Sequence, residues 1–271
     1  MRNVRGSRPV APELVEQIRD RYLAIGGSSP LLARTREQAA ALAAELDLPV
    51  YFGMRNWRPS IPETLAEMKA AGITHVVAVC LAPQYSKMSV GLYFRRLQEA
   101  KNELGFDAKV TWTKSFHDHP LIIAAFADLL KPLLPTERVL FTAHSLPTRI
   151  LAEGDPYDSE ARATARLVAE HLGLGDWEFA YQSQGLSGGD WLGPSVESRL
   201  DAFAAAGVRD IVLAPIGFVA DHVEILYDVD IEFMDYAHNK GITLRRPASL
   251  NDSPAFIKAL AAVVRQRLET S

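Results

Sequence analysis

The chain has 271 residues, of which 48% are hydrophobic and 23% charged, and its formal net charge is −4 at pH 7. This length and composition suit a globular protein with a full core, and the charge gives no reason to expect nucleic acid or an anionic membrane surface as partner. Cys80 is the single cysteine, which excludes an internal disulfide and a cysteine-ligated iron–sulfur cluster within one chain. The sequence shows no apolar run as long as the roughly 20 residues of a membrane span and no signal peptide, so we expect a cytoplasmic protein.

Short apolar segments rich in Val, Ile and Leu alternate with longer segments of helical spacing. The segments that we predict as strands are residues 50–54, 75–83, 108–114, 138–144, 177–184, 210–218 and 242–245. The segments that we predict as helices are residues 60–71, 90–104, 158–172, 195–206 and 254–268. Uninterrupted apolar runs such as 76–81 are typical of strands buried on both faces. The alternation therefore predicts an α/β fold with parallel sheets flanked by helices.

The Pro-rich segment 131–137 is typical of a boundary between two halves. Each half contains three or four predicted strands, so we predict two similar α/β lobes, residues 1–131 and 132–250, facing a cleft. A closing helix within residues 251–271 is expected to pack back on the lobes.

Ligands of open parallel sheets bind beyond the carboxyl ends of the strands. The unusual segments that follow predicted strands in this chain are residues 53–55, 82–86, 143–147, 182–185 and 217–222. Because these ends converge, we expect the functional site in the cleft between the lobes.

His144 directly follows the apolar run 139–143, and Pro147 ends the strand soon afterwards. A neutral imidazole at this position can accept a proton or bind a borderline metal such as iron(II). The alternative is a core histidine that is hydrogen-bonded to the backbone. Loops after strands often carry functional residues, which raises the functional interpretation to the same weight as the alternative.

Glu224, Asp228 and Glu232 are spaced by four, which places their carboxylates along one helix face. Like charges at this spacing destabilise a helix by about 0.2–0.5 kcal/mol per pair. The row therefore indicates a metal ion, a proton path or a nearby cation, and a solvated acidic face is the alternative. Asp221 and His222, which precede the row, are expected to cap the helix or to orient other side chains.

Arg5, Arg8 and Arg21 surround the region before the Gly- and Ser-containing segment 26–31. Guanidinium groups, hydroxyls and glycines together can hold carboxylates, and arginine offers them a bidentate geometry. A basic surface next to a turn is the alternative, and composition alone favours it.

Along essentially its whole length the chain resembles the ferrochelatases of haem biosynthesis. The motifs that carry the resemblance are residues 24–31, 82–86, 141–147, 154–157, 182–184 with 191–194, and 215–228. The resemblance implies a chelatase-like fold of two Rossmann-like lobes with a porphyrin cleft between them. It also implies an enzyme that inserts ferrous iron into a porphyrin, with Fe2+ as substrate and no prosthetic group or iron–sulfur cluster. The implied partners are the porphyrin, ferrous iron and a downstream enzyme of the haem pathway, and the expected state is a monomer.

By the same resemblance, His144 and Glu224 are the catalytic pair at the metal-insertion site, and Asp228 and Glu232 extend the metal-binding row. The residues that it implies as contacts of the tetrapyrrole and its propionates are Arg5, Arg21, Tyr22, Ser29, Arg55 and Tyr93. Segments 81–83 and 217–220 look more like the enzymes that use coproporphyrin III than those that use protoporphyrin IX, so we expect a preference for coproporphyrin III.

The chain departs from the family pattern at its start, because family members begin with a further strand and loop before the position of Met1. We expect that the lost strand would weaken the first lobe. Two other interpretations stay open. One is a shortened, non-catalytic tetrapyrrole-binding paralogue, which the missing strand favours. The other is a cobalt chelatase of the corrin pathway, against which the carboxylate row and the motif at 141–147 argue.

Overall fold

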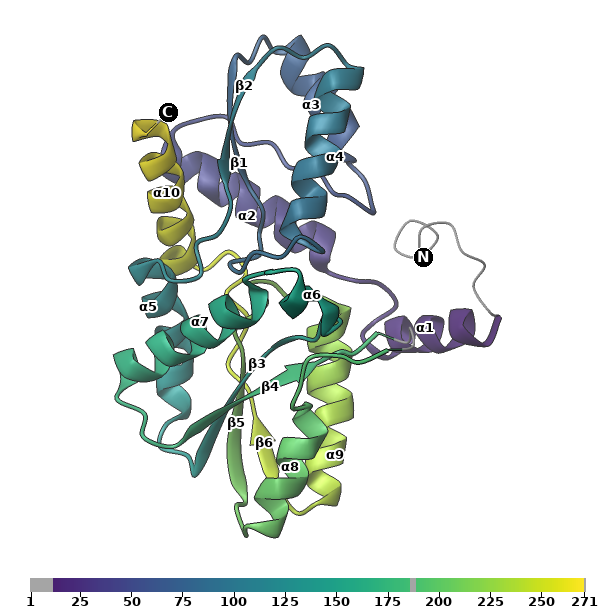
Figure 1. Cartoon of the computed structure of the whole chain (residues 1–271), viewed down its shortest axis with the longest axis vertical. Helices are drawn as coiled ribbons and strands as arrows, with labels where there is room; N and C mark the ends of the chain where they lie inside the picture. Colours follow the sequence, from purple (N-terminus) through teal and green to yellow (C-terminus); the bar gives the residue numbers. More distant parts are fainter. Residues whose placement is uncertain (1–11, 186–188, 271) are drawn as a thin grey trace.

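A computed structural model describes residues 12–185 and 189–270 of the chain (Figure 1). The strands of these residues are β1 (His75–Val79), β2 (Lys109–Thr113), β3 (Arg138–His144), β4 (Trp177–Gln182), β5 (Asp210–Pro215) and β6 (Thr243–Arg245). The first helices are α1 (Pro12–Ala24), α2 (Leu31–Leu46), α3 (Ile61–Ala70), α4 (Val90–Glu103), α5 (Pro120–Leu130) and the 3-10 turn η1 (Lys131–Leu133). The later helices are α6 (Arg149–Ala152), α7 (Tyr157–Leu172), α8 (Val196–Ala205), η2 (Glu224–Phe233), α9 (Met234–Asn239) and α10 (Pro254–Glu269). The predicted α/β fold with parallel sheets is confirmed.

The upper lobe in Figure 1 is built around the parallel pair β1 and β2, in which His75 lies opposite Lys109. Helices α3 and α4 pack against each other beside this pair, and their core contains Leu65, Val76 and Ala100. Helix α3 begins at a capping box, in which the Ser60 hydroxyl accepts from the backbone N–H three residues later and that residue's carboxylate accepts in return.

The prediction of a strand at residues 50–54 is wrong. In this segment only Met54 forms a bridge, with Ser60, and in the described part of the chain no other strand pairs with it. The upper sheet therefore has two described strands instead of the three or four that we predicted for each half. An apolar run such as Val50-Tyr51-Phe52 predicts burial, but a strand also needs a neighbour to satisfy its backbone groups.

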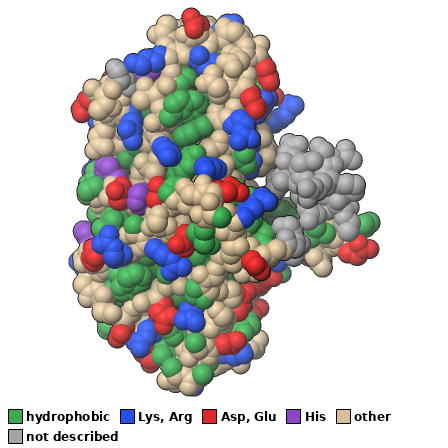
Figure 2. Space-filling view, viewed as in Figure 1, with side chains coloured by type: hydrophobic (Ala, Val, Ile, Leu, Met, Phe, Trp, Pro, Cys, Tyr) green, Lys and Arg blue, Asp and Glu red, His purple; other side chains and the backbone are tan. Residues whose placement is uncertain are grey.

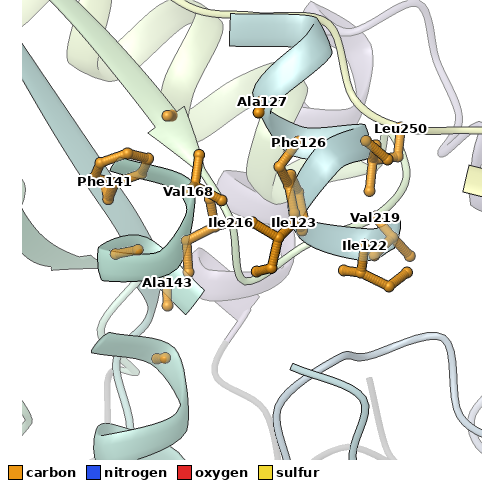
Figure 3. Packing of buried hydrophobic residues seen from close by; sticks show 14 of the residues in the cluster. Ile122, Ile123, Phe126, Ala127, Phe141, Ala143, Val168, Ile216, Val219 and Leu250 are labelled. Atoms are coloured by element: carbon orange, nitrogen blue, oxygen red, sulfur yellow. The ribbon is translucent and has the colours of Figure 1, made fainter. Parts of the chain in front are cut away.

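The lower lobe contains a parallel sheet of four strands in the order β4-β3-β5-β6. Helices cover both faces of this sheet, which explains why its strands are apolar without alternation. Along β3, Phe141 and Ala143 face the core formed with α5, α7 and α10, whereas Leu140 faces the core formed with α8, η2 and α9. Figure 3 shows the first of these cores, where Phe141 and Val168 approach Ile216 from separate elements.

The last helix, α10, joins the two lobes. It packs against α5 and also against α2, β1 and β2 of the upper lobe (Figure 1). Helix α5 packs in turn on α7 of the lower lobe. Gln38 of α2 adds a buried polar link, because its amide donates to the Asn251 carbonyl at 2.9 Å. None of the described helices is both long and apolar enough to cross a bilayer.

Most strands end earlier than the sequence predicted, and the difference falls at their carboxyl ends. Strand β1 ends at Val79 and β5 at Pro215, several residues before the predicted ends at 83 and 218. The residues that follow are buried like strand residues, Ile216 and Val219 among them, so their apolar character does not distinguish them from a strand. These segments are loops beside His144 and Glu224, the predicted catalytic pair.

Candidate active site at the lobe junction

His144 is the last residue of β3, in the middle of the lower sheet. Its Nδ1 lies against the carbonyl oxygen of Ser145, and since a carbonyl can only accept, Nδ1 carries the proton. In the neutral ring Nε2 is then free of a proton. This atom faces Glu224, with 3.5 Å between Nε2 and Oε2. The imidazole therefore presents a lone pair for a metal ion or a proton at the junction of the lobes.

Glu224 opens η2 and lies between two imidazoles. Its Oε2 is 3.5 Å from Nε2 of His144 and 3.8 Å from Nε2 of His222, and it has no hydrogen-bond partner within the described residues. His222 also directs its Nδ1 to a carbonyl, that of Ala220 at 2.9 Å, which leaves its Nε2 toward the carboxylate. One carboxylate and two ring nitrogens thus converge, and His222 belongs to the site as well as to the helix start.

The charges of the imidazoles decide the ionisation of Glu224. Burial raises the pKa of its carboxyl, but the attraction of His144 and of the nearby His222 in their protonated forms and the charge of Arg21 together outweigh this effect and leave the pKa lowered. Burial lowers the pKa of His222, and the neighbouring Glu224 carboxylate outweighs that effect and leaves it raised. Glu224 is therefore ionised at neutral pH and available as a ligand or proton acceptor.

The predicted acidic row lies along η2, which is a π-helix of ten residues. Its wider turn still keeps residues four apart on one side. Asp228 is buried, and its carboxylate accepts hydrogen bonds from the Ser183 hydroxyl and from Arg21 Nη1, the latter at 3.1 Å. Glu232 is half exposed, and its carboxylate accepts from Arg21 Nη2 at 3.1 Å. Burial raises the pKa of Asp228 more than Ser183 and Arg21 lower it. Of the three partners that the row of carboxylates indicated, the structure shows a nearby cation, the Arg21 guanidinium.

Arg21 comes from α1, which extends sideways from the body of the molecule in Figure 1. Besides bridging the two carboxylates, its guanidinium lies over the ring of Tyr227, 4.8 Å from the centroid. On the face shown in Figure 2, acidic side chains gather along the right-hand edge of the lower lobe, on the side of α9. Arg21, which the resemblance assigned to the tetrapyrrole, is paired with Asp228 and Glu232 in the structure.

Two of the predicted tetrapyrrole contacts meet on the upper lobe. The Arg55 guanidinium lies 5.5 Å from the ring centroid of Tyr93, and its buried Nε has no hydrogen-bond partner. Arg55 forms no ion pair with any described residue, unlike Arg21. A partly buried, unpaired guanidinium over an aromatic ring is suited to receive an anionic ligand.

The remaining predicted contacts have local roles or lie outside the structure. The Tyr22 carbonyl accepts from Gly27 N–H at 2.8 Å in the turn after α1, and the Ser29 hydroxyl accepts from Leu31 N–H at 3.3 Å at the start of α2. Arg5 lies outside the described residues.

Sequence reasoning missed Arg246, which follows β6. It forms a bidentate pair with Asp230 on η2, with 2.6 Å between Nη2 and Oδ2, and its Nη2 is 3.7 Å from Asp221 Oδ1. Asp221 in turn accepts from Ser249 and Asn251. These contacts fix the start and the middle of the helix that carries the acidic row. No local signal in the sequence pairs positions so far apart.

The described residues contain no group of three or more His, Cys, Asp or Glu side chains that could hold a metal ion. The predicted row is instead spread along η2, with the His144–Glu224 pair at one end and the pair of Asp228 and Glu232 around Arg21 at the other. This arrangement does not resemble a closed structural metal site, which has four protein ligands.

Comparison with known proteins connects this geometry to a family. The ferrochelatase family model matches residues 6–268. A ferrochelatase from Acidobacterium capsulatum is 45% identical over 99% of this chain and 89% of its own length. A coproporphyrin III ferrochelatase from Bacillus pumilus is 36% identical over 99% of this chain and 91% of its own length. Among solved structures, SirB from Bacillus subtilis with Fe3+ superposes with a TM-score of 0.67 at 13% identity, covering 87% of this chain and 88% of SirB, which is a likeness of fold.

Proposed function

The chain belongs to the ferrochelatase family, enzymes that insert a metal ion into a porphyrin in haem synthesis, and from this premise we propose that its reaction is the insertion of ferrous iron into coproporphyrin III. In this proposal His144 and Glu224 form the metal-ligand and proton-acceptor pair. The observation that carries it is the 3.5 Å approach of His144 Nε2 to an ionised, partly buried Glu224 carboxylate at the carboxyl end of β3.

The chemistry of insertion requires two things of the protein: the iron must lose its water ligands, and the two pyrrole protons must leave the macrocycle. The lone pair of His144 Nε2 and the Glu224 carboxylate supply a nitrogen and an oxygen ligand, which suit iron(II). The same atoms accept protons, and general-base help of this kind is typically worth about 10²–10⁴ in rate.

A pair of ligands also suits an ion that has to move on. A site with a full set of protein ligands holds its metal, whereas a nitrogen and a carboxylate leave the remaining positions to water and to the macrocycle nitrogens. Iron is in this proposal a substrate that passes from the protein pair to the porphyrin. His222, 3.8 Å from the same carboxylate oxygen, orients Glu224 and supports its charge.

The acidic row gives iron an approach to this pair. Asp228 and Glu232 follow Glu224 along the same side of η2, and Arg21 occupies the space between their carboxylates. A divalent cation that displaces the Arg21 guanidinium would exchange one positive partner for another, so the carboxylates need not lose their compensation during its passage.

The preference for coproporphyrin III rests on the upper lobe and on the relatives. Coproporphyrin III carries more carboxylates than protoporphyrin IX, and Arg55 is a partly buried guanidinium without an ion pair in the described structure. Several relatives with the name coproporphyrin III ferrochelatase are 34–36% identical to this chain. Arg55 over Tyr93 is thus the first propionate contact in this proposal, and Tyr22, Ser29 and Arg5 are further predicted contacts.

The test is anaerobic iron(II) insertion into coproporphyrin III and protoporphyrin IX, followed by absorbance, with cobalt(II) as a competing metal. We expect faster insertion into coproporphyrin III, and iron preferred over cobalt. His144→Ala should abolish insertion and leave porphyrin binding measurable, whereas His171→Ala, at an exposed histidine in the last turn of α7, serves as control. Normal turnover of His144→Ala would refute the site, and porphyrin binding without insertion by the unaltered chain would support a tetrapyrrole-binding protein.

A further inference from the structure

Asp155 lies between α6 and α7 and connects the two lobes through both of its carboxylate oxygens. It is 7% exposed. Its Oδ2 accepts from the Ser86 hydroxyl at 3.0 Å and from the Lys87 N–H at 2.7 Å, both in the loop after β1 of the upper lobe. Its Oδ1 accepts from the Tyr157 N–H at 3.0 Å, in the first turn of α7. One buried carboxylate therefore holds a loop of the upper lobe against a helix of the lower lobe.

On the upper side, Ser86 leads directly to the predicted tetrapyrrole contacts. Its hydroxyl accepts from Met88 N–H at 3.0 Å, and its carbonyl accepts from Gly91 N–H at 2.9 Å in the first turn of α4. Tyr93 follows two residues later on that helix and lies under the Arg55 guanidinium. The position of this Arg55–Tyr93 pair thus depends on where the loop around Ser86 is held.

On the lower side, Tyr157 leads directly to the metal-insertion pair. Its buried hydroxyl donates to the His144 carbonyl at 2.9 Å, at the point where β3 ends. The backbone N–H of Tyr157 donates the hydrogen bond that Asp155 Oδ1 accepts. Because a hydrogen bond to the carbonyl restricts the peptide of His144, it also restricts the direction in which the imidazole points.

We propose that Asp155 is a positioning residue that holds the tetrapyrrole-contacting face of the upper lobe in register with His144. The chain of contacts runs from Gly91, in the first turn of the helix that carries Tyr93, through Ser86, Asp155 and Tyr157 to His144. Its effect is to set the distance between the bound macrocycle and the imidazole. The inference rests on the proposed role of Arg55 and Tyr93 as tetrapyrrole contacts. A misplacement of about 1 Å at a reacting centre can cost about 10²-fold in rate.

The experiment removes one contact on each side of Asp155. Ser86→Ala deletes the hydroxyl contact to Asp155 and leaves the one from the Lys87 N–H, and Tyr157→Phe deletes the hydroxyl contact to the His144 carbonyl. Both are small changes that leave the Asp155 carboxylate in place. Glu160→Gln is the matched control, because Glu160 Oε2 accepts from the Tyr85 N–H of the same loop at 2.7 Å without a link to the His144 carbonyl. The measurement is kcat/KM for iron insertion in each single variant and in the two double variants that contain Tyr157→Phe.

We expect Ser86→Ala and Tyr157→Phe each to lower kcat/KM by up to about tenfold, and the double variant to lose clearly less than the product of the two, because both changes weaken the same chain of contacts. Glu160→Gln combined with Tyr157→Phe should give the product of the single effects. The absorbance spectrum of the bound porphyrin should shift in Ser86→Ala and not in Tyr157→Phe, which reports on the two sides separately.

Three results would overturn the inference: multiplicative losses in both double variants, equal coupling in both pairs, or full activity of Ser86→Ala. Equal coupling would mean that anchoring of the loop as a whole, and not Asp155, carries the effect. If the unaltered protein inserts no iron, the proposed function fails. If it does insert iron and the losses multiply, only the role of Asp155 fails.

Discussion

Glu224→Gln removes the negative charge between the two imidazoles while keeping the size of the side chain. Oε2 of Glu224 is 3.5 Å from Nε2 of His144, and a unit positive charge at that nitrogen, which a proton supplies, gains 332/(20 × 3.5), or about 5 kcal/mol, at an effective dielectric constant of about 20. The two side chains are 31% and 32% exposed, so solvent screening reduces this to about half. A loss of about 2.5 kcal/mol corresponds to about 70-fold in rate, at 1.36 kcal/mol per tenfold.

The assay is the kcat for iron insertion under anaerobic conditions across pH, and we expect Glu224→Gln to lower it about 10²-fold or more, since the lost proton acceptor adds to the lost charge. The sign of the pH dependence follows from the lowered pKa of Glu224. Its carboxylate is charged above that pKa, so the unaltered enzyme loses activity as pH falls through it, and the variant loses this limb.

Glu178→Gln is the matched control, because Glu178 has a similar exposure of 38% and pairs with Arg199 on the lower lobe, away from the pair. A kcat of Glu224→Gln within threefold of the Glu178→Gln value would refute the assigned role of the carboxylate.

Burial raises the pKa of Asp228, so its ionised form lowers stability at pH values above the raised pKa. Asp228→Asn should therefore raise the melting temperature at about pH 7 and not at about pH 3, in calorimetry, while it slows iron insertion; an equal shift at both values would contradict this. A methyl group on Gly217 would lie 2.9 Å from Ala143 Cα and Cβ, so Gly217→Ala should destabilise the protein by about 1–3 kcal/mol in urea unfolding. Gly175→Ala, with no atom within 4 Å of the added Cβ, should be close to neutral. Arg55→Lys loses the planar fork that matches a carboxylate, and we expect about a tenfold rise in the KM for coproporphyrin III in steady-state kinetics; an unchanged KM would remove Arg55 from the porphyrin site.

The parts of the fold that could be predicted from the sequence are those in which burial and pairing coincide. The run Val139–Ala143 is apolar without alternation because helices cover both faces of its sheet, and the sequence shows this directly. The segment 50–54 is just as apolar but has no strand beside it in the described structure. Likewise, Ile216 and Val219 are buried in a loop. The hydrophobic pattern of a sequence predicts which residues are buried, but it does not predict which backbone groups form hydrogen bonds with a neighbouring strand.

The candidate site shows the same division. The spacing of Glu224, Asp228 and Glu232 identified a common helix face, which a π-helix preserves as an α-helix would. The partner of that face could not be predicted, because Arg21 lies 207 residues from Asp228 along the chain and the pair forms only in the folded protein. Arg246 was missed for the same reason. Sequence spacing determines contacts within an element, whereas contacts between elements depend on how the lobes are placed.

The contacts of α10 have a consequence for the order in which the protein can fold during synthesis. This helix covers β1 and β2 of the upper lobe, yet it is translated after all the strands of both lobes. The upper lobe emerges first from the ribosome but must wait for residues 254–269 before its sheet is covered. A nascent chain therefore exposes the apolar side of its first lobe throughout translation of the second, at roughly 5–20 residues per second. The core on one face of the lower sheet also includes α10, so both halves of the molecule depend on the helix that is made last.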